Sequence, residues 1–149
     1  MGIKEAIIGQ KLYLDANLFI YTLEEVAPWV EVTSQILAAV DVGECSAVTS
    51  ELTLAECLVK PLALGRTDVV QQYLSLLQNR RFFTVLPLSR EILIEAATLR
   101  ATTRLKLPDA LHVATAQRQN CTLFVTNDDR LRAVPDLHLL YLRDLVAQL

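Results

Sequence analysis

The sequence has few of the residues that mark fibrous or disordered chains. Its 149 residues include only 4 Gly and 5 Pro, while 52% are hydrophobic. Collagen-like and low-complexity structures need far more glycine and proline, and a disordered chain is less apolar than this. The length is typical of one domain, so we expect a single domain spanning residues 1–149.

Cysteine and long hydrophobic runs are also scarce. Cys45, Cys57 and Cys121 are far apart, and no CxxC or Cys/His motif is present. This favours reduced thiols in the core and argues against zinc. The longest stretch without a charged residue runs only from Val69 to Asn79, whereas a membrane span needs about 20 residues. We therefore expect a cytoplasmic protein with no membrane segment.

Charge is unevenly distributed along the chain. The net charge is −3, but residues 1–75 hold 4 Lys/Arg and 10 Asp/Glu, whereas residues 76–149 hold 10 Lys/Arg and 7 Asp/Glu. An acidic balance argues against non-specific coating of DNA. It remains compatible with a local site in which metal ions neutralise a carboxylate cluster and arginines flank it.

Short apolar runs alternate with longer stretches of helical period. We expect strands at residues 11–15, 45–49, 82–86 and 122–126, with a short fifth at 138–142, and helices between them. In the helix at 51–60, Thr53 is expected to act as a cap and Pro61 to end the helix. Continuous apolar strands separated by helices predict a three-layer α/β/α sandwich around a mostly parallel sheet.

Acidic residues recur where such a sheet binds ligands, at the carboxyl ends of its strands. Asp15 ends the first strand and Asp128 follows the fourth, while Asp109 lies in the first turn of the preceding helix. Each also has an ordinary structural interpretation. Asp15 suits a helix cap, Asp109 suits the positive end of a helix dipole, and Asp128 suits a turn.

Glu56 is harder to explain as a structural residue. It lies on the helix after the second strand, with Leu52, Ala55, Cys57 and Leu58 around it. A carboxylate in apolar surroundings is costly unless it is paired. A cation shared with other carboxylates would remove that cost, and a cap formed with Thr53 is the alternative.

Four runs carry these acids in order along the chain. They are Tyr13-Leu-Asp15-Ala-Asn17, Thr53-Leu-Ala-Glu56, Leu107-Pro-Asp109-Ala-Leu-His-Val-Ala-Thr-Ala116 and Val125-Thr-Asn-Asp128. Together they resemble the successive motifs of PIN-domain nucleases, and most closely those of VapC-type toxins from bacterial toxin–antitoxin pairs. The resemblance covers residues 11–142. It implies a parallel sheet of four to five strands and a Mg²⁺- or Mn²⁺-dependent endoribonuclease that forms homodimers and is neutralised by a small antitoxin protein.

The resemblance also implies which residues act. Its catalytic acids correspond to Asp15, Glu56, Asp109 and Asp128; of these, the three aspartates are expected to bind metal, with Asn17 and Thr126 lining the site. Asp129 is the alternative to Asp128 as the fourth acid. Carboxylate oxygens are the ligands that Mg²⁺ prefers, and a metal-bound water of lowered pKa is suited to attack on the phosphorus of RNA.

Several other polar residues have two open interpretations. His112, on the same helical face as Asp109, is either a buried structural histidine or a base or support of the site. Six basic residues near the acids are either RNA-backbone contacts or solvated surface residues. They are Arg100, Arg104, Lys106, Arg118, Arg130 and Arg132.

Two other functions compete with an RNA nuclease. A phosphatase or receiver that is phosphorylated on aspartate also places an Asp at a strand end. Such phosphatases usually carry a second Asp two residues on, where this chain has Asn17, and receivers need a late Lys, whereas none follows Lys106. The non-enzymatic alternative is a catalytically silent PIN-like module that binds RNA or protein; the complete acid set disfavours it.

Overall fold

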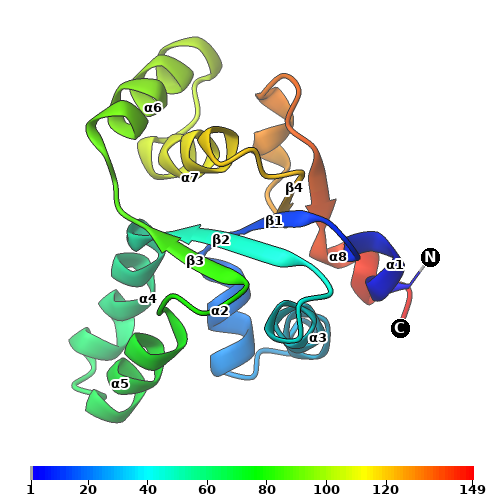
Figure 1. Ribbon diagram of the computed structural model, residues 1–149. Coiled ribbons are helices and arrows are strands. Elements are labelled where there is room, and N and C mark those ends of the chain that lie inside the picture. The colour runs from blue at the N-terminus through cyan, green and yellow to red at the C-terminus, as the bar shows by residue number, and fades with distance from the viewer. Residues whose placement is uncertain (1) are drawn as a thin grey trace.

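Five parallel strands form the central sheet in a computed structural model that describes residues 2–149 (Figure 1). The strand order is β3-β2-β1-β4-β5, so the first strand lies in the middle. Tyr13 on the central strand is in register with Val48 and Phe124 on its two neighbours. The predicted parallel sheet is therefore confirmed, including the short fifth strand. The strands are β1 (Lys11–Leu14), β2 (Ser46–Ser50), β3 (Phe83–Leu86), β4 (Leu123–Thr126) and β5 (Leu139–Tyr141).

Helices cover both faces of this sheet, as Figure 1 shows. Alternate residues of β1 point to opposite faces, so Leu12 and Leu14 join one hydrophobic core and Tyr13 joins the other. On the first face pack α1 (Ile3–Ile7), α2 (Ala16–Leu23), α3 (Val30–Asp41), α4 (Glu51–Ala63), α5 (Thr67–Leu76) and α8 (Leu142–Val146). On the second lie α6 (Arg90–Thr103), α7 (Leu107–Arg118) and the 3-10 helix η1 (Asp129–Ala133). The predicted three-layer sandwich is confirmed.

Helix α7 is the most deeply buried helix of the second layer. Every residue from Ala110 to Ala116 is buried, and α6 packs across it from outside. The small alanines in this stretch let α7 lie close to the sheet, and Pro108 in its first turn has no N–H left unpaired. This packing fixes Asp109, in the same first turn, at one edge of the sheet.

The order in which strands are added to the sheet changes side at the central strand β1. From β1 the chain steps outward to β2 and β3, and then returns through α6 and α7 to place β4 on the other side of β1. In open α/β sheets a ligand crevice forms at such a switch point, outside the carboxyl ends of the strands. Asp15 follows β1 and Asp128 follows β4, so the topology puts both acids beside this point.

Two local predictions about helix α4 are wrong. The helix starts directly after β2, so Ser50 is its cap and accepts a hydrogen bond from the backbone N–H of Leu52. Thr53 is instead buried and hydrogen-bonded to Thr49. Pro61 lies inside the helix, which continues to Ala63, because a proline this near the end removes only one helical hydrogen bond and here packs its ring into the interior.

The short helix α1 is absent from the predicted elements, because five residues are too few to show a helical period. Among residues 2–149, no helix combines the length and the apolar character needed to cross a membrane.

Candidate active site

Asp15 occupies the position between β1 and α2 that was predicted for it. It is the N-cap residue of α2; its side chain makes no strict capping hydrogen bond, but the backbone N–H groups of Asn17 and Leu18 are near enough to favour its charged form, so capping accounts for part of its setting. The pKa of Asp15 is raised to about 6, mainly by burial and in smaller part by the nearby Glu56. His112 and the backbone N–H groups of Asn17 and Leu18 oppose this rise. The Asp15 carboxylate is therefore held in a place where its negative charge is costly.

Glu56 has a partner in a neighbouring helix. Its Oε1 lies 2.6 Å from Nε2 of His112, and Nδ1 of the same imidazole lies 2.6 Å from the hydroxyl of Tyr13. His112 is 4% exposed and Tyr13 is fully buried. This chain of hydrogen bonds links β1, α7 and α4, and it holds the Glu56 carboxylate at the surface end. The sequence left open whether His112 is a buried structural residue or a support of the site. It is both, because it is buried and hydrogen-bonded to Glu56.

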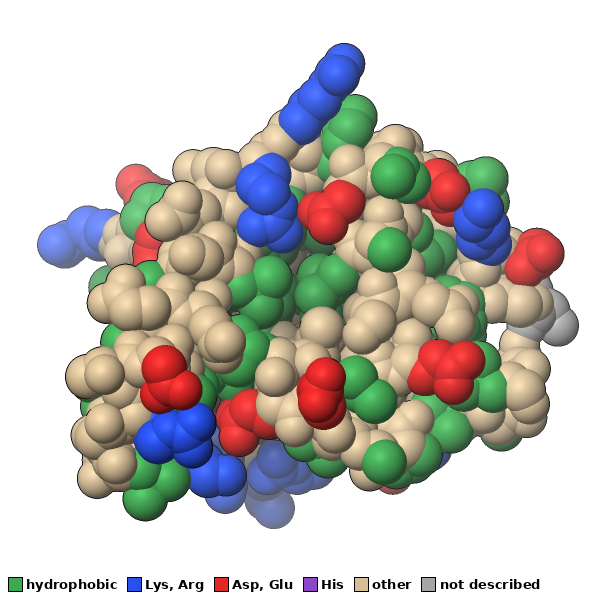
Figure 2. Space-filling model, turned by 90° about the horizontal axis from the view of Figure 1, so that it is seen from below, with side chains coloured by type: hydrophobic (Ala, Val, Ile, Leu, Met, Phe, Trp, Pro, Cys, Tyr) green, Lys and Arg blue, Asp and Glu red, His purple; other side chains and the backbone are tan. Residues whose placement is uncertain are grey.

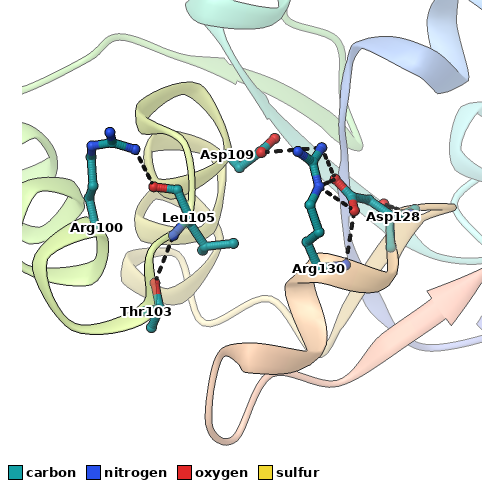
Figure 3. Close-up of polar contacts among 7 residues, drawn as sticks. Arg100, Thr103, Leu105, Asp109, Asp128 and Arg130 are labelled. Atoms are coloured by element: carbon teal, nitrogen blue, oxygen red, sulfur yellow. Dashed lines mark hydrogen bonds and ion pairs between the residues drawn. The ribbon is translucent and has the colours of Figure 1, made fainter.

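Asp109 and Asp128 meet at a single arginine (Figure 3). Arg130 makes hydrogen bonds of 2.7–3.1 Å from its guanidinium to both oxygens of Asp128, and its Nη2 lies 3.7 Å from Oδ2 of Asp109. The hydrogen bonds from Arg130 lower the pKa of Asp128, whereas burial raises that of Asp109, with Asp128 adding to the rise. Arg130 therefore neutralises one acid and only partly relieves the other.

The remaining predicted residues lie around these acids. Thr126 is the last residue of β4, and its buried hydroxyl accepts a hydrogen bond of 3.0 Å from the backbone N–H of Asp128, which fixes that turn. Asn17 lies in the first turn of α2 and is exposed at the same edge. Asp129 is bound by Arg143, with 2.6 Å between Oδ1 and Nη2, and this ion pair lowers its pKa. Of the two candidates for the fourth acid, Asp128 is therefore the one in contact with the group that also reaches Asp109.

The four acids lie near enough to influence one another in a chain from Asp15 through Glu56 and Asp109 to Asp128. Glu56 raises the pKa of both Asp15 and Asp109, and Asp128 also raises that of Asp109. Carboxylates this close repel one another, and an added cation relieves the repulsion. Their oxygen atoms match what Mg²⁺ and Mn²⁺ bind. Within residues 2–149, however, no three acidic, histidine or cysteine side chains stand ready as a ligand set. Glu56 and Asp128 are already engaged by His112 and Arg130.

Two members of this arrangement carried weak signals in the sequence. Tyr13 was not identified as part of the site, although it lies two residues before Asp15 and therefore on the same side of the extended chain. Arg130 was one of six basic candidates. The structure separates these: Arg118 pairs with Glu95, and Arg132 donates to the hydroxyl of Tyr141.

A family model described as PIN domain matches residues 12–137, and the chain therefore belongs to the PIN domain family. No curated protein sequence matches it. Three solved structures share the fold. VapBC2 of Rickettsia felis, bound to promoter DNA, aligns with a TM-score of 0.69 at 17% identity over 88% of this chain and 98% of that chain. A toxin–antitoxin complex from Klebsiella pneumoniae gives 0.63 at 24% identity, over 85% and 94%.

The third structure is VapC20 of Mycobacterium tuberculosis, described as a toxin that cleaves the sarcin–ricin loop. It gives a TM-score of 0.64 at 9% identity, over 76% of this chain and 86% of that one. At such identities the three likenesses establish the fold, and the family itself is shown by the family model that matches residues 12–137.

Proposed function

We propose that this chain is a Mg²⁺- or Mn²⁺-dependent endoribonuclease that hydrolyses RNA phosphodiester bonds. The observation that carries the proposal is the convergence of Asp15, Glu56, Asp109 and Asp128, from four separate elements, on one edge of the sheet beside its switch point. Membership of the PIN domain family supports the same reading.

The residues divide the work as follows. Asp15, Asp109 and Asp128 supply carboxylate oxygens, and Asp15 and Asp109 have the most to gain from a cation because their pKa values are raised. His112, itself fixed by Tyr13, orients the fourth carboxylate. A divalent metal ion, when bound, supplies an activated water and positive charge for the phosphoryl oxygens.

Arg130 is suited to the substrate. The side chain of Arg130 is 59% exposed, and the planar donor set of its guanidinium lies beside Asp109 and Asp128. Arginine binds phosphate through two parallel hydrogen bonds as readily as it binds a carboxylate. A bound cation would neutralise Asp109 and Asp128, and the guanidinium of Arg130 would then be available to hold the scissile phosphate.

We further propose that the protein is the toxin of a toxin–antitoxin pair and acts as a cytoplasmic homodimer. The solved structures that share its fold include two toxin–antitoxin assemblies and one RNA-cleaving toxin, which supports a small antitoxin protein as partner. Cellular RNA as the substrate requires access to the cytoplasm.

The test is cleavage of a mixed RNA pool by the purified protein with Mn²⁺ or Mg²⁺. We expect cleavage that stops with EDTA and in the Asp15→Asn variant. The matched control is Asp41→Asn, which removes an exposed acid at the end of α3, near the opposite edge of the sheet, where it pairs with Arg80. This control is expected to cleave like the wild type.

Cleavage that survives either EDTA or Asp15→Asn would overturn the proposal. RNA binding without cleavage, together with no detectable metal binding, would favour the silent PIN-like binding module instead.

A further inference from the structure

A pocket of about 360 Å³ begins at Asp109 and Arg130 of the proposed active site and extends to residues that have no role in the proposed chemistry. Its size lies at the small end of the range for ligand pockets. It lies between the loop that joins α6 to α7 and the helix η1. Asp109 and Arg130 form the side of the pocket that faces the carboxylate cluster. The lining residues are Thr103, Arg104, Leu105, Lys106, Asp109, Arg130 and Ala133.

The lining carries more positive than negative charge. Arg104 and Lys106 are exposed, and within residues 2–149 neither forms an ion pair. Lys106 is near enough to Asp128 to help lower its pKa. By contrast, Arg118 and Arg132 are held by carboxylates elsewhere. Arg104 and Lys106 are therefore the basic residues near the site that remain available to an anionic ligand.

The loop that carries these cations is held in place from both sides (Figure 3). Nη1 of Arg100 donates a hydrogen bond of 2.7 Å to the carbonyl oxygen of Leu105, and the backbone N–H of Leu105 points to the hydroxyl of Thr103 at 3.4 Å. The Leu105 side chain is buried. A fixed loop presents its charges in one place, which reduces the entropy lost when a ligand binds.

Arg104 sits on an unusual backbone. It ends α6 with φ of 63°, in the left-handed region where glycine is the favoured residue. Strain of this kind is often kept where a side chain has a function. An arginine at this position is therefore less stable than a glycine would be, but it places a positive charge at the edge of the pocket.

We propose that this pocket is a substrate subsite, which holds the nucleotide next to the scissile phosphate of a single-stranded RNA. Arg104 and Lys106 contact the RNA backbone there, while Arg130 stands between the pocket and the carboxylates. The inference rests on the proposed function, because it is the carboxylate cluster that defines where the scissile phosphate lies. Phosphate contacts position a nucleic acid without reading its sequence, so the subsite sets the register of the strand.

The test measures RNA binding without cleavage. A fluorescent RNA of about ten nucleotides, within the site sizes usual for single strands, is titrated with protein in EDTA. We expect Arg104→Gln/Lys106→Gln to weaken binding about tenfold and to reduce the salt dependence of log K by about 1.4, since each lost contact to a single strand contributes about 0.7.

The matched control is Arg81→Gln/Arg90→Gln, which changes the net charge equally. Arg90 begins α6, so it lies about 20 Å from the pocket end of this 14-residue helix. Arg81 precedes β3 at the amino-terminal edge of the sheet, opposite the acids. The control is expected to bind RNA within about threefold of the wild type.

Equal losses in the two double variants, or no loss in Arg104→Gln/Lys106→Gln, would overturn the subsite. So would the absence of wild-type binding at about 100 µM, the weak end of non-specific affinities. A second variant guards against misfolding: Arg104→Gly removes the charge where the backbone favours glycine, and it is expected to raise the melting temperature while weakening RNA binding.

The outcomes also separate the two proposals. Metal-dependent cleavage together with unchanged binding in Arg104→Gln/Lys106→Gln refutes the subsite alone. Selective loss of binding in that variant, in a protein that does not cleave RNA, supports the pocket as an RNA site and refutes the nuclease.

Discussion

Replacing Asp15 with asparagine is expected to stabilise the protein at neutral and alkaline pH. The pKa of Asp15 is raised from 3.8 to about 6, mainly by burial, so its folded state binds a proton more tightly than its unfolded state. Stability from this group is therefore fully present below pH 3.8 and is lost as the pH rises through 6. The ionised wild type carries an electrostatic cost that a neutral amide of the same shape does not.

The size of the effect follows from the two pKa values. A difference of 2.2 units, from 3.8 to about 6, corresponds to about 3 kcal/mol of unfolding free energy at pH 8. At pH 4 the same two values leave only about 0.6 kcal/mol. Urea denaturation of wild type and Asp15→Asn, without metal and across this pH range, measures the difference directly.

Asp128→Asn is the matched control, because the same substitution in the same cluster should have the opposite sign. Hydrogen bonds from Arg130 lower the pKa of Asp128, so its charged form stabilises the fold above the unfolded pKa. We expect Asp128→Asn to lose roughly 0.5–1 kcal/mol at pH 8, since the pair is partly solvated. An Asp15→Asn variant that is no more stable than the wild type at pH 8, or the same sign for both variants, would refute this reasoning.

Three further predictions concern other parts of the site. Tyr13→Phe leaves Nδ1 of the buried His112 without its hydrogen-bond partner and should lower the unfolding free energy by about 1–3 kcal/mol in urea. The control is Tyr21→Phe, at a half-buried tyrosine that stacks on Trp29, and it should be nearly neutral; equal losses in the two variants would contradict this role of Tyr13. Arg104→Gly should gain about 0.5–1 kcal/mol and raise the melting temperature by about 2–3 °C, and a lower value would show that its backbone is not strained. Millimolar Mg²⁺ should raise the melting temperature of the wild type more than that of Asp109→Asn, because only a folded site binds the ion; equal shifts would place the ion elsewhere.

The fold was accessible from local patterns alone. Each strand is a short apolar run flanked by helices, and such runs are typical of parallel strands buried on both faces. The acids could be placed at the carboxyl ends of strands for the same reason. Pro61 shows the limit of local rules: whether a proline ends a helix depends on how its ring packs, and here it is buried in the last turn.

The connections within the site were not accessible from local patterns. His112 meets Glu56 across 56 positions of the chain and Tyr13 across 99, so no local spacing reveals either hydrogen bond. Periodicity places His112 on the face of α7 that carries Asp109, but the partners come from other elements. The same holds for the six basic residues, whose roles separate only when their neighbours are known.

The measurement that tests the central claim most directly is a calorimetric titration of the metal-free protein with Mn²⁺. The account predicts saturable binding by the wild type, loss of that binding in Asp15→Asn and Asp109→Asn, and wild-type binding in Asp41→Asn. Wild-type affinity in Asp15→Asn and Asp109→Asn, or no binding by the wild type, would contradict the assignment of these carboxylates to one metal site.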